Sequence, residues 1–340
     1  LQDGETKQVE VGERSVLLVR LDGEYFAVAG ECPHVGAELG DGLLCAGHLR
    51  CPWHHARYAA RTGDLEEPTS LDGLPRFDVR IEGEEVIVSV PEEAPEKRVM
   101  PMAEFDPSAD DRTFVIVGAG ASGAAAAEAM RQSGFQGHIR MIAPEGIRPY
   151  DRTELSKFYL KKEGSESKPP YLRSQEFYED HRIDLISGRR AVKVDPVSRT
   201  IKLDDGSSLD YDRALLATGS RARGLGVGGC KLNEIFTLRS VADADRLRAA
   251  IERAEKAVVV GASFIGMETA AMMSGRGLDV TVVAPESEPF ANTLGPEVGK
   301  LFRDLHESKG VEFCLGRTVH RFEGEDEVEA VVLDDDERLR

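Results

Sequence analysis

Two cysteines and two histidines alternate along one stretch of the chain, as Cys32 with His34 and then Cys51 with His54. Thiolates and imidazoles together can hold a [2Fe–2S] centre in which one iron takes the sulfur ligands and the other iron takes the nitrogen ligands. The competing interpretation is a Cys₂His₂ zinc site, but such sites usually place both cysteines before both histidines. The interleaved order therefore favours a two-iron centre over zinc.

The segments C-P-H and C-P-W-H resemble the ligand loops of the Rieske ferredoxin family, and the resemblance extends over about residues 1–90. It implies that Cys32 and Cys51 bind one iron of the cluster and that His34 and His54 bind the other. A proline follows each cysteine, which suits a tight loop folded around a cluster.

The chain departs from the respiratory branch of that family. Ala37 and Trp53 stand where that branch has two cysteines joined by a disulfide, so no such bond is possible here. Ala56 replaces a serine that donates a hydrogen bond to a cluster sulfur, although Tyr58 remains available as a donor. Because such hydrogen bonds stabilise the reduced cluster, we expect a reduction potential at the low end of a range from about −150 to +300 mV.

The elements around these loops read as short β-strands. Between residues 7 and 30 apolar residues alternate with polar ones, and Asp22-Gly23 is a hairpin turn signal. Residues 77–81 and 86–90 predict a second hairpin. We therefore expect an all-β domain over residues 1–90. Residues 91–112 contain several prolines and no apolar periodicity, which predicts a linker between domains.

Length and composition set wider limits. The chain has 340 residues, enough for two or three domains, and a formal net charge of −18. The acidic balance disfavours nucleic acid and anionic membranes as partners. No apolar run approaches the ~18 residues of a membrane span. Five cysteines without a disulfide pattern suit a reducing compartment, so we expect a cytoplasmic protein.

A dinucleotide fingerprint begins after the linker. Residues 114–117 read as a buried strand, Gly118, Gly120 and Gly123 follow in the pattern G-x-G-x-x-G, and residues 124–131 read as a helix. The glycines permit a tight turn, close approach of a pyrophosphate and packing of helix on strand. Glu145 follows the next predicted strand and is placed to accept a hydrogen bond from an adenosine ribose.

Two later segments indicate FAD. Residues 149–157 resemble the P-Y-x-R-x-x-L-S-K motif of FAD-dependent ferredoxin reductases and apoptosis-inducing-factor-like proteins, which implies that Arg152 and Lys157 lie near the flavin and makes Lys157 a catalytic candidate. Residues 217–220 resemble the A-T-G-S motif of the same enzymes, and this implies cofactor contacts for Thr218 and Gly219. Related disulfide reductases carry a cysteine pair where this chain has residues 152–160, and no cysteine occurs there.

A second fingerprint follows a strand at residues 256–260 and contains Gly261, Ser263 and Gly266. It resembles the NAD(P)H domain of the same flavoproteins, in which the glutamate matching Glu268 lies near the nicotinamide and is a catalytic candidate. Ser263 replaces the second glycine of the pattern. Glu286 is the acidic residue nearest the end of the next strand, and no arginine stands there to meet a 2′-phosphate, so NADH is favoured over NADPH.

The predicted architecture is multidomain. An N-terminal all-β Rieske [2Fe–2S] domain (1–90) and a linker (91–112) precede two α/β Rossmann-like domains, the first part of an FAD domain (113–222) and an NAD(P)H domain (223–340). In the resembled family a return strand and an interface domain follow, so the NAD(P)H domain is expected to be incomplete at its C-terminus and the sequence to be a fragment.

The order of domains resembles that of the apoptosis-inducing-factor 3-like oxidoreductases. It implies a reductase that passes electrons from NAD(P)H through FAD to the Rieske centre and on to a partner protein such as a ferredoxin, an oxygenase or another electron acceptor. Two alternatives stay open at this point. One is the electron-input part of a nitrite reductase system, and the other is a redox sensor or scaffold that binds cofactors without turnover.

Overall fold

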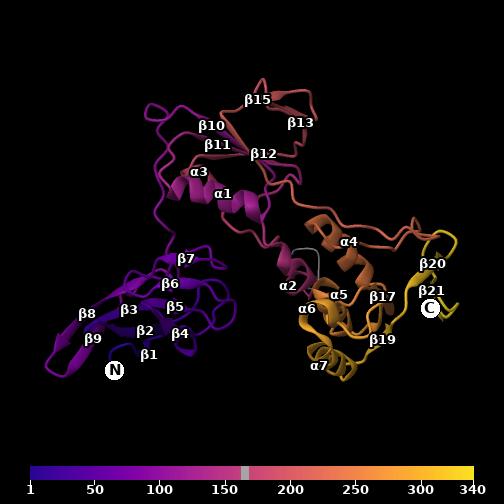
Figure 1. Ribbon diagram of the computed structural model, residues 1–340, viewed down its shortest axis with the longest axis horizontal. Coiled ribbons are helices and arrows are strands. Elements are labelled where there is room, and N and C mark those ends of the chain that lie inside the picture. The colour runs from indigo at the N-terminus through magenta and orange to yellow at the C-terminus, as the bar shows by residue number, and fades with distance from the viewer. Residues whose placement is uncertain (162–167) are drawn as a thin grey trace. The chain divides into compact units, whose positions relative to one another are not determined.

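A computed structural model describes residues 1–161 and 168–340 of the chain (Figure 1). Two compact units are present, the first built from residues 1–103 and the second from most of the remainder. Each unit has hydrophobic clusters of its own. In the part of the chain that the structure describes, no helix has the length and apolar character needed to cross a membrane.

Two antiparallel sheets form the first unit. The larger has the order β1-β2-β3-β8-β9 and contains β1 (Thr6–Val11), β2 (Arg14–Leu21), β3 (Glu24–Ala29), β8 (Arg76–Glu82) and β9 (Glu85–Ser89). The smaller has the order β4-β5-β6-β7 and contains β4 (Leu43–Cys45), β5 (His48–Arg50), β6 (Arg57–Ala59) and β7 (Leu65–Glu67). A single turn of 3₁₀ helix, η1 (Leu39–Asp41), precedes β4. The expected all-β domain is confirmed.

Strand β2 separates two hydrophobic clusters of this unit. Leu17 and Val19 belong to one cluster, and Val16 and Leu18 belong to the other. Side chains alternate between the faces of a strand, so a run of apolar residues that is buried throughout means that both faces are covered. The cluster with Leu17 and Val19 also contains the ligand cysteines predicted from the sequence, so this face of the sheet supports the metal site.

The hairpin between β2 and β3 turns at Asp22-Gly23, as predicted. Both residues have positive φ, 51° and 80° respectively. A two-residue turn of this kind matches the right-handed twist of the flanking strands, and Asp-Gly tolerates it well.

Part of the segment that the sequence predicts to be a linker is attached to the first unit. Gly73 and Arg98 exchange two backbone hydrogen bonds, of 2.8 and 3.0 Å. Lys97 forms an ion pair of 3.2 Å with Asp72, which is almost fully buried. The compact unit accordingly extends to Ala103, beyond the boundary expected at residue 90. The other domain boundaries stay predictions.

The second unit begins with a four-stranded parallel sheet in the order β12-β11-β10-β16. Its strands are β10 (Thr113–Val117), β11 (His138–Ala143), β12 (Ile183–Ser187) and β16 (Arg213–Leu216). The helical segments are α1 (Ala121–Gln132), η2 (Arg152–Ser156), α2 (Phe158–Lys161) and α3 (Gln175–Asp180). A small antiparallel sheet is formed by β13 (Ala191–Asp195), β14 (Thr200–Leu203) and β15 (Ser208–Asp210).

The same unit contains a second parallel sheet, in the order β17-β18-β19. Its strands are β17 (Lys256–Val260), β18 (Asp279–Ala284) and β19 (Val311–Leu315). The helices are α4 (Val241–Ile251), α5 (Phe264–Ser274), α6 (Ala291–Leu294) and α7 (Pro296–Glu307). An antiparallel sheet of β20 (Val319–Glu323), β21 (Ala330–Leu333) and β22 (Arg338–Leu339) follows. Each fingerprint therefore lies between a parallel strand and a helix, as the sequence predicts.

Candidate redox and dinucleotide sites

The two ligand loops of the first unit are closed by the same hydrogen bond. The N–H of Cys32 donates to the carbonyl of Ala37 over 2.8 Å, and the N–H of Cys51 donates to the carbonyl of Ala56 over 2.9 Å. Both alanines are fully buried. Each loop thus returns to its starting cysteine after five residues, and a small side chain fills the space beneath it.

A second backbone hydrogen bond is also the same in the two ligand loops. The N–H of Gly36 donates to the carbonyl of Cys32 (2.9 Å), and the N–H of His55 donates to the carbonyl of Cys51 (3.2 Å). Gly36 and His55 both have positive φ. The loops differ in sequence but share one backbone path, which the sequence analysis did not foresee for His55.

The four predicted ligands lie together as two unlike pairs. Cys32 and Cys51 are each 2% exposed, belong to the same buried cluster, and neither forms a disulfide. The rings of His34 and His54 lie with centroids 4.8 Å apart, and His54 is exposed. Among the residues described, no three His, Cys, Asp or Glu side chains surround one ion position. The arrangement matches two metal ions with unlike pairs of ligands better than one zinc ion.

Two hydroxyl groups reach these ligands from other strands and loops. The Oη atom of Tyr58, a fully buried residue of β6, lies 3.1 Å from the Sγ atom of Cys32. Burial raises the pKa of Tyr58 far above its usual value, and the contact with Cys32 raises it further, so the phenol keeps its proton. Thr69 Oγ1 lies 3.1 Å from Nδ1 of His34. Tyr58 is the donor predicted from the sequence, whereas no local sequence pattern marks Thr69.

The residues present fit a [2Fe–2S] cluster. Burial raises the pKa of the Cys32 thiol, although the hydrogen bond with Tyr58 opposes the change. A buried thiol pair is a poor place for free negative charge and a good place for thiolates that a cation neutralises. Cys32 and Cys51 would hold one iron, His34 and His54 would hold the other, and Tyr58 would donate to a ligand sulfur.

The first dinucleotide turn follows β10 directly. Gly118 has φ of 119°, and a Cβ atom there would lie 2.2 Å from the carbonyl oxygen of Ala217. A Cβ atom on Gly123 would lie 2.0 Å from the carbonyl oxygen of Gly118. A Cβ atom on Gly120, in contrast, would meet no atom within 4 Å. The first and third glycines are therefore required by the protein's own packing, whereas the second leaves open space where a pyrophosphate is expected.

One of the two segments predicted to contact FAD, the A-T-G-S segment, meets the first fingerprint at this turn. Thr218 and Gly219 follow Ala217, the residue against which Gly118 packs, and both are exposed. Gly219 has φ of 64°, a conformation that glycine adopts without strain. The structure thus brings the A-T-G-S segment to the first fingerprint.

Glu145 lies in a polar network after β11. Its carboxylate accepts a hydrogen bond from the Oη atom of Tyr150 (2.6 Å) and is ion-paired with Arg152. Arg152 also donates to the carbonyl oxygen of Arg239 over 2.6 Å, and Arg239 donates to the carbonyl oxygen of Ser220 over 3.2 Å. Arg239 belongs to no motif that the sequence shows. Its only signal is its position immediately before the N-cap residue of α4.

The two catalytic candidates are in contact. Lys157 follows η2 in the first half of the unit, Glu268 lies in α5, and their Nζ and Oε2 atoms are 3.3 Å apart. The hydroxyl of Ser156 donates to the same Oε2 atom over 2.5 Å. Lys157 also donates to the carbonyl oxygen of Thr153 over 2.8 Å. A charged pair therefore joins the P-Y-x-R-x-x-L-S-K segment to the helix of the second fingerprint, and Ser156 is a further member that the sequence analysis missed.

The second fingerprint repeats the packing of the first. Gly261 has φ of 110°, and a Cβ atom on Gly266 would lie 1.9 Å from the carbonyl oxygen of Gly261. Ser263 is the N-cap residue of α5, but its side chain makes no capping hydrogen bond. A serine in this place adds a Cβ atom where a pyrophosphate is expected, and its hydroxyl is also a possible donor to that group.

Glu286 lies in the turn after β18, at the carboxyl end of the second parallel sheet. Its carbonyl oxygen accepts a hydrogen bond from the N–H of Gly316 (2.9 Å), and its Oε1 atom accepts one from Asn292 (3.2 Å). The side chain is half-buried. Glu286 thus lies at the carboxyl end of the strands, and dinucleotides bind at this end of such sheets.

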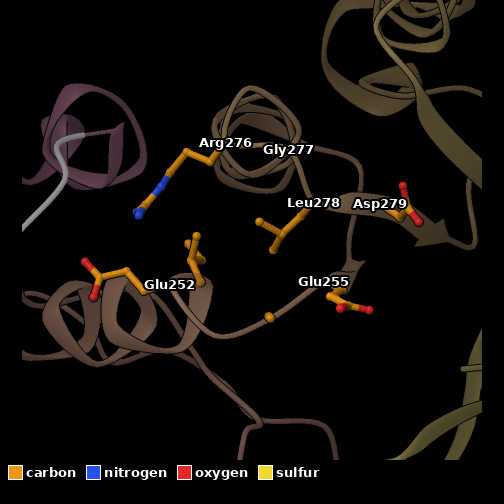
Figure 2. A pocket seen from close by; sticks show the side chains of 8 residues that line it. Glu252, Glu255, Arg276, Gly277, Leu278 and Asp279 are labelled. Atoms are coloured by element: carbon orange, nitrogen blue, oxygen red, sulfur yellow. The ribbon is translucent and has the colours of Figure 1, made fainter.

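A pocket of about 720 Å³ opens at the other end of this sheet (Figure 2). It is lined by Ile251, Glu252, Ala254, Glu255, Arg276, Gly277, Leu278 and Asp279. Glu255 precedes β17 and Asp279 begins β18, so the pocket lies at the amino ends of the strands. It therefore belongs to neither fingerprint.

Comparison with known families agrees with the division of the chain into two units. Residues 112–340 match the family model "Pyridine nucleotide-disulphide oxidoreductase", and residues 1–78 match the model "Rieske [2Fe-2S] domain". These matches imply a [2Fe–2S] cluster, FAD and NADH, which are the cofactors expected from the sequence.

Individual relatives resemble the whole chain or its second unit. The chain is 37% identical to apoptosis-inducing factor 3 of Homo sapiens, over 98% of this chain and 55% of that protein. It is also 37% identical to the biphenyl dioxygenase system ferredoxin–NAD(+) reductase component of Paraburkholderia xenovorans strain LB400, over 67% of this chain and 55% of that protein. The chain thus spans about half the length of these curated relatives.

Solved structures give the same result for the fold. The ferredoxin reductase for the CYP199A2 system of Rhodopseudomonas palustris matches 67% of this chain and 56% of its own, with a TM-score of 0.65 and 35% identity. A putidaredoxin reductase–putidaredoxin complex matches 67% of this chain and 56% of its own, with a TM-score of 0.63 and 32% identity. The chain therefore belongs to the pyridine nucleotide-disulphide oxidoreductase family and carries a Rieske [2Fe–2S] domain in addition.

Proposed function

We propose that the protein takes electrons from NADH and passes them by way of FAD to its [2Fe–2S] centre and then to a partner redox protein. FAD accepts a hydride as a pair of electrons and can release them singly, whereas the cluster takes one electron at a time. In the order of electron transfer, FAD must therefore come after the donor and before the cluster.

The contact between Lys157 and Glu268 carries this proposal. It joins the segment expected beside the flavin to the helix expected beside the nicotinamide, over 3.3 Å. Lys157 would place a positive charge at the flavin, and Glu268 would keep that charge paired. Ser156 donates to the same carboxylate oxygen and fixes its direction. A preorganised charged group at a reacting centre is a common means of lowering a barrier.

The segment that contains Lys157 supports transfer of electrons to the cluster instead of to a disulfide. Thiol–disulfide exchange beside the flavin needs a cysteine pair, and residues 152–160 contain none. The chain instead contains the ligand set of an iron–sulfur centre, with His54 exposed and both cysteines buried.

Glu286 supports NADH as the donor. A carboxylate at the carboxyl end of the second strand repels a 2′-phosphate and can accept a hydrogen bond from a 2′-hydroxyl. The partner would be a ferredoxin, an oxygenase or another electron acceptor, by analogy with the reductase components named above. We place the protein in the cytoplasm, because its five cysteines form no disulfide.

The electron route can be tested with two variants of the full-length protein. In the first, Cys32 and Cys51 are both changed to Ser, so NADH should still bleach the flavin at a near-normal rate while electrons no longer reach the acceptor. In the second, Gly120→Val fills the open space at the first fingerprint, so FAD should be lost while the cluster assembles. That cluster should stay oxidised under NADH and be reduced by dithionite.

Anaerobic NADH titration followed by visible and EPR spectra reports both centres. Reduction of the cluster by NADH in flavin-free protein would overturn the route. So would unchanged turnover with the natural acceptor after loss of the cluster, which would make the first unit a docking or regulatory module. Absence of any NADH-dependent bleaching in the intact protein would favour the sensor or scaffold alternative. Copurification of a haem-bearing chain would favour the nitrite reductase alternative.

A further inference from the structure

The fold brings an arginine to the turn that contains Glu286, although the sequence has none in that turn. Arg317 follows β19, the neighbour of β18 in the second parallel sheet. Its N–H donates to the carbonyl oxygen of Ala284, the last residue of β18, over 3.1 Å. The N–H of the preceding residue, Gly316, donates to the carbonyl oxygen of Glu286 over 2.9 Å. The backbone of Arg317 therefore runs beside the end of β18.

This place is the one at which dinucleotide-binding folds distinguish NADH from NADPH. An acidic residue at the end of the second strand accepts a hydrogen bond from the 2′-hydroxyl of NADH, and an arginine nearby accommodates the 2′-phosphate of NADPH. Neighbouring strands lie about 4.8 Å apart, so the end of β18 is within the reach of an arginine side chain that starts at the end of β19. Arg317 is thus a potential partner for a 2′-phosphate.

The guanidinium of Arg317 is instead engaged by the turn between β21 and β22. Its Nε atom lies 3.2 Å from Oδ1 of Asp334, its Nη2 atom is ion-paired with Asp335, and its Nη1 atom lies 3.5 Å from Oε2 of Glu337. The hydrogen bond from Arg317 holds the pKa of Asp334 below its usual value. Each nitrogen of the guanidinium therefore already faces a carboxylate.

The same turn is fastened to the residue that follows Arg317. The N–H of Asp334 donates to the carbonyl oxygen of Thr318 (3.0 Å), and the hydroxyl of Thr318 donates to Oδ2 of Asp334 (3.1 Å). The turn itself is closed by the N–H of Leu333, which donates to the carbonyl oxygen of Glu337 (2.9 Å). Three carboxylates around one guanidinium leave the group net negative, so Arg317 attracts no phosphate while these contacts last.

We propose that the turn at residues 334–337 determines donor specificity, because it holds Arg317 away from the adenosine ribose and so withholds it from the 2′-phosphate of NADPH. Specificity is a difference between two affinities, and removal of a cation from the reach of the competitor's extra phosphate increases that difference. Glu286 adds direct repulsion of the same phosphate. The inference rests on the proposed function, in which the ribose of NADH lies beside Glu286.

The test starts from Glu286→Ser in the full-length protein with FAD bound, because this change removes the direct repulsion and a competing partner for a released Arg317. Asp335→Asn and Glu337→Gln are then added together. Asp334 is kept because it also holds Thr318. Isothermal titration compares the affinities for adenosine 2′,5′-bisphosphate and for AMP, which differ only in the 2′-phosphate. Initial rates give kcat/KM with NADPH.

We expect the two added substitutions to increase the affinity for the bisphosphate by about 10-fold or more, the scale of one hydrogen bond between charged groups. The affinity for AMP should stay the same, and kcat/KM with NADPH should rise with the affinity for the bisphosphate. Addition of Arg317→Met should abolish both gains. This last variant distinguishes release of the arginine from a general loss of negative charge.

A matched control removes two carboxylates elsewhere. Glu325→Gln with Glu327→Gln changes the net charge equally in the exposed loop between β20 and β21, and it should give no gain. Should the altered turn fail to fold, Asp335→Asn alone is the second variant. It keeps an oxygen atom for the N–H of Glu337, which donates to Oδ1 of Asp335 over 3.1 Å, and it should give a smaller gain in the same direction.

Two results would overturn the role of the turn. One is an unchanged affinity for the bisphosphate in folded protein with either set of turn substitutions. The other is a gain that persists after Arg317→Met, since the arginine would then not be the group that binds the phosphate. A natural protein that binds neither AMP nor NADH would instead overturn the proposed function.

Discussion

Gly36 and His55 hold the same position in the two ligand loops and share a left-handed backbone, with φ of 77° and 64°. Glycine adopts this conformation freely, whereas most other residues pay about 1–2 kcal/mol for it. Histidine and asparagine tolerate it better than branched residues.

We therefore expect His55→Gly to keep or raise the stability of the second loop, and His55→Val to lower it by about 1–2 kcal/mol. The chain has a single tryptophan, Trp53, which lies in this loop and is 59% exposed. Its fluorescence during urea unfolding reports the loop directly. His55→Asn is the matched control and should behave like the natural protein. Equal stability of the Val and Gly variants would show that the backbone of the loop is different.

Cluster ligation is tested by Cys51→Ser and by His54→Ala. Each removes one of the proposed ligands, so iron and labile sulfide should fall steeply while flavin absorbance stays. Cys45→Ser removes an exposed free cysteine near the same loops and should keep the full cluster. Stoichiometric iron and sulfide in Cys51→Ser would exclude these residues as ligands.

Substitution of the second and of the third glycine of the FAD fingerprint should have different effects, one on FAD binding and the other on folding. A Cβ atom on Gly123 would overlap a backbone carbonyl at 2.0 Å, so Gly123→Ala should destabilise the second unit by roughly 1–3 kcal/mol or prevent its folding. A Cβ atom on Gly120 meets nothing within 4 Å, so Gly120→Ala should leave the melting temperature of the FAD-free protein unchanged. Its FAD affinity should nevertheless fall. Thermal melts and fluorescence titration with FAD measure the two effects, and equal melting temperatures for both variants would refute the distinction.

The charged pair at the proposed flavin site is tested by Lys157→Met and Glu268→Gln. Each should slow reduction of the flavin by NADH, by about 10-fold or more, because a preorganised charge is lost. Since the two side chains touch, the double variant should be slowed less than the product of the two single effects. Stopped-flow absorbance gives the rates. Lys161→Met, in an exposed position at the end of α2, should have no effect.

Donor choice is tested by Glu286→Arg. The natural protein should have the higher kcat/KM with NADH, and the variant should narrow the difference because an arginine attracts a 2′-phosphate. Initial rates with both donors in a complete protein give the ratio. If the natural protein prefers NADPH, the carboxylate of Glu286 does not face the ribose.

Residue type and local spacing account for the parts of the site that the sequence could predict. The ligand pairs and the glycines of both fingerprints are close in sequence, and strand, turn and helix follow one another without long connections. Asp22-Gly23 predicted its hairpin for the same reason, because turn geometry depends on two adjacent residues.

Contacts that form only after folding were beyond the reach of the sequence. Ser156 and Lys157 meet Glu268 only because η2 and α5 pack together. Arg239 reaches the network of Glu145 from a loop that is distant in sequence. His55 follows a ligand directly, but its backbone conformation is imposed by closure of the whole loop, and no propensity of histidine would have revealed it.

The matched ligand loops have a consequence for how the centre fails. Each loop supplies one thiolate and one imidazole, so under the proposed ligation each loop touches both irons. Displacement of one whole loop therefore withdraws a ligand from both metals at once and leaves neither with its pair of protein ligands. A stable one-iron remnant is therefore not expected. Partial iron content in an aged sample should reflect a mixture of intact and empty molecules, with an EPR signal that loses intensity but keeps its shape.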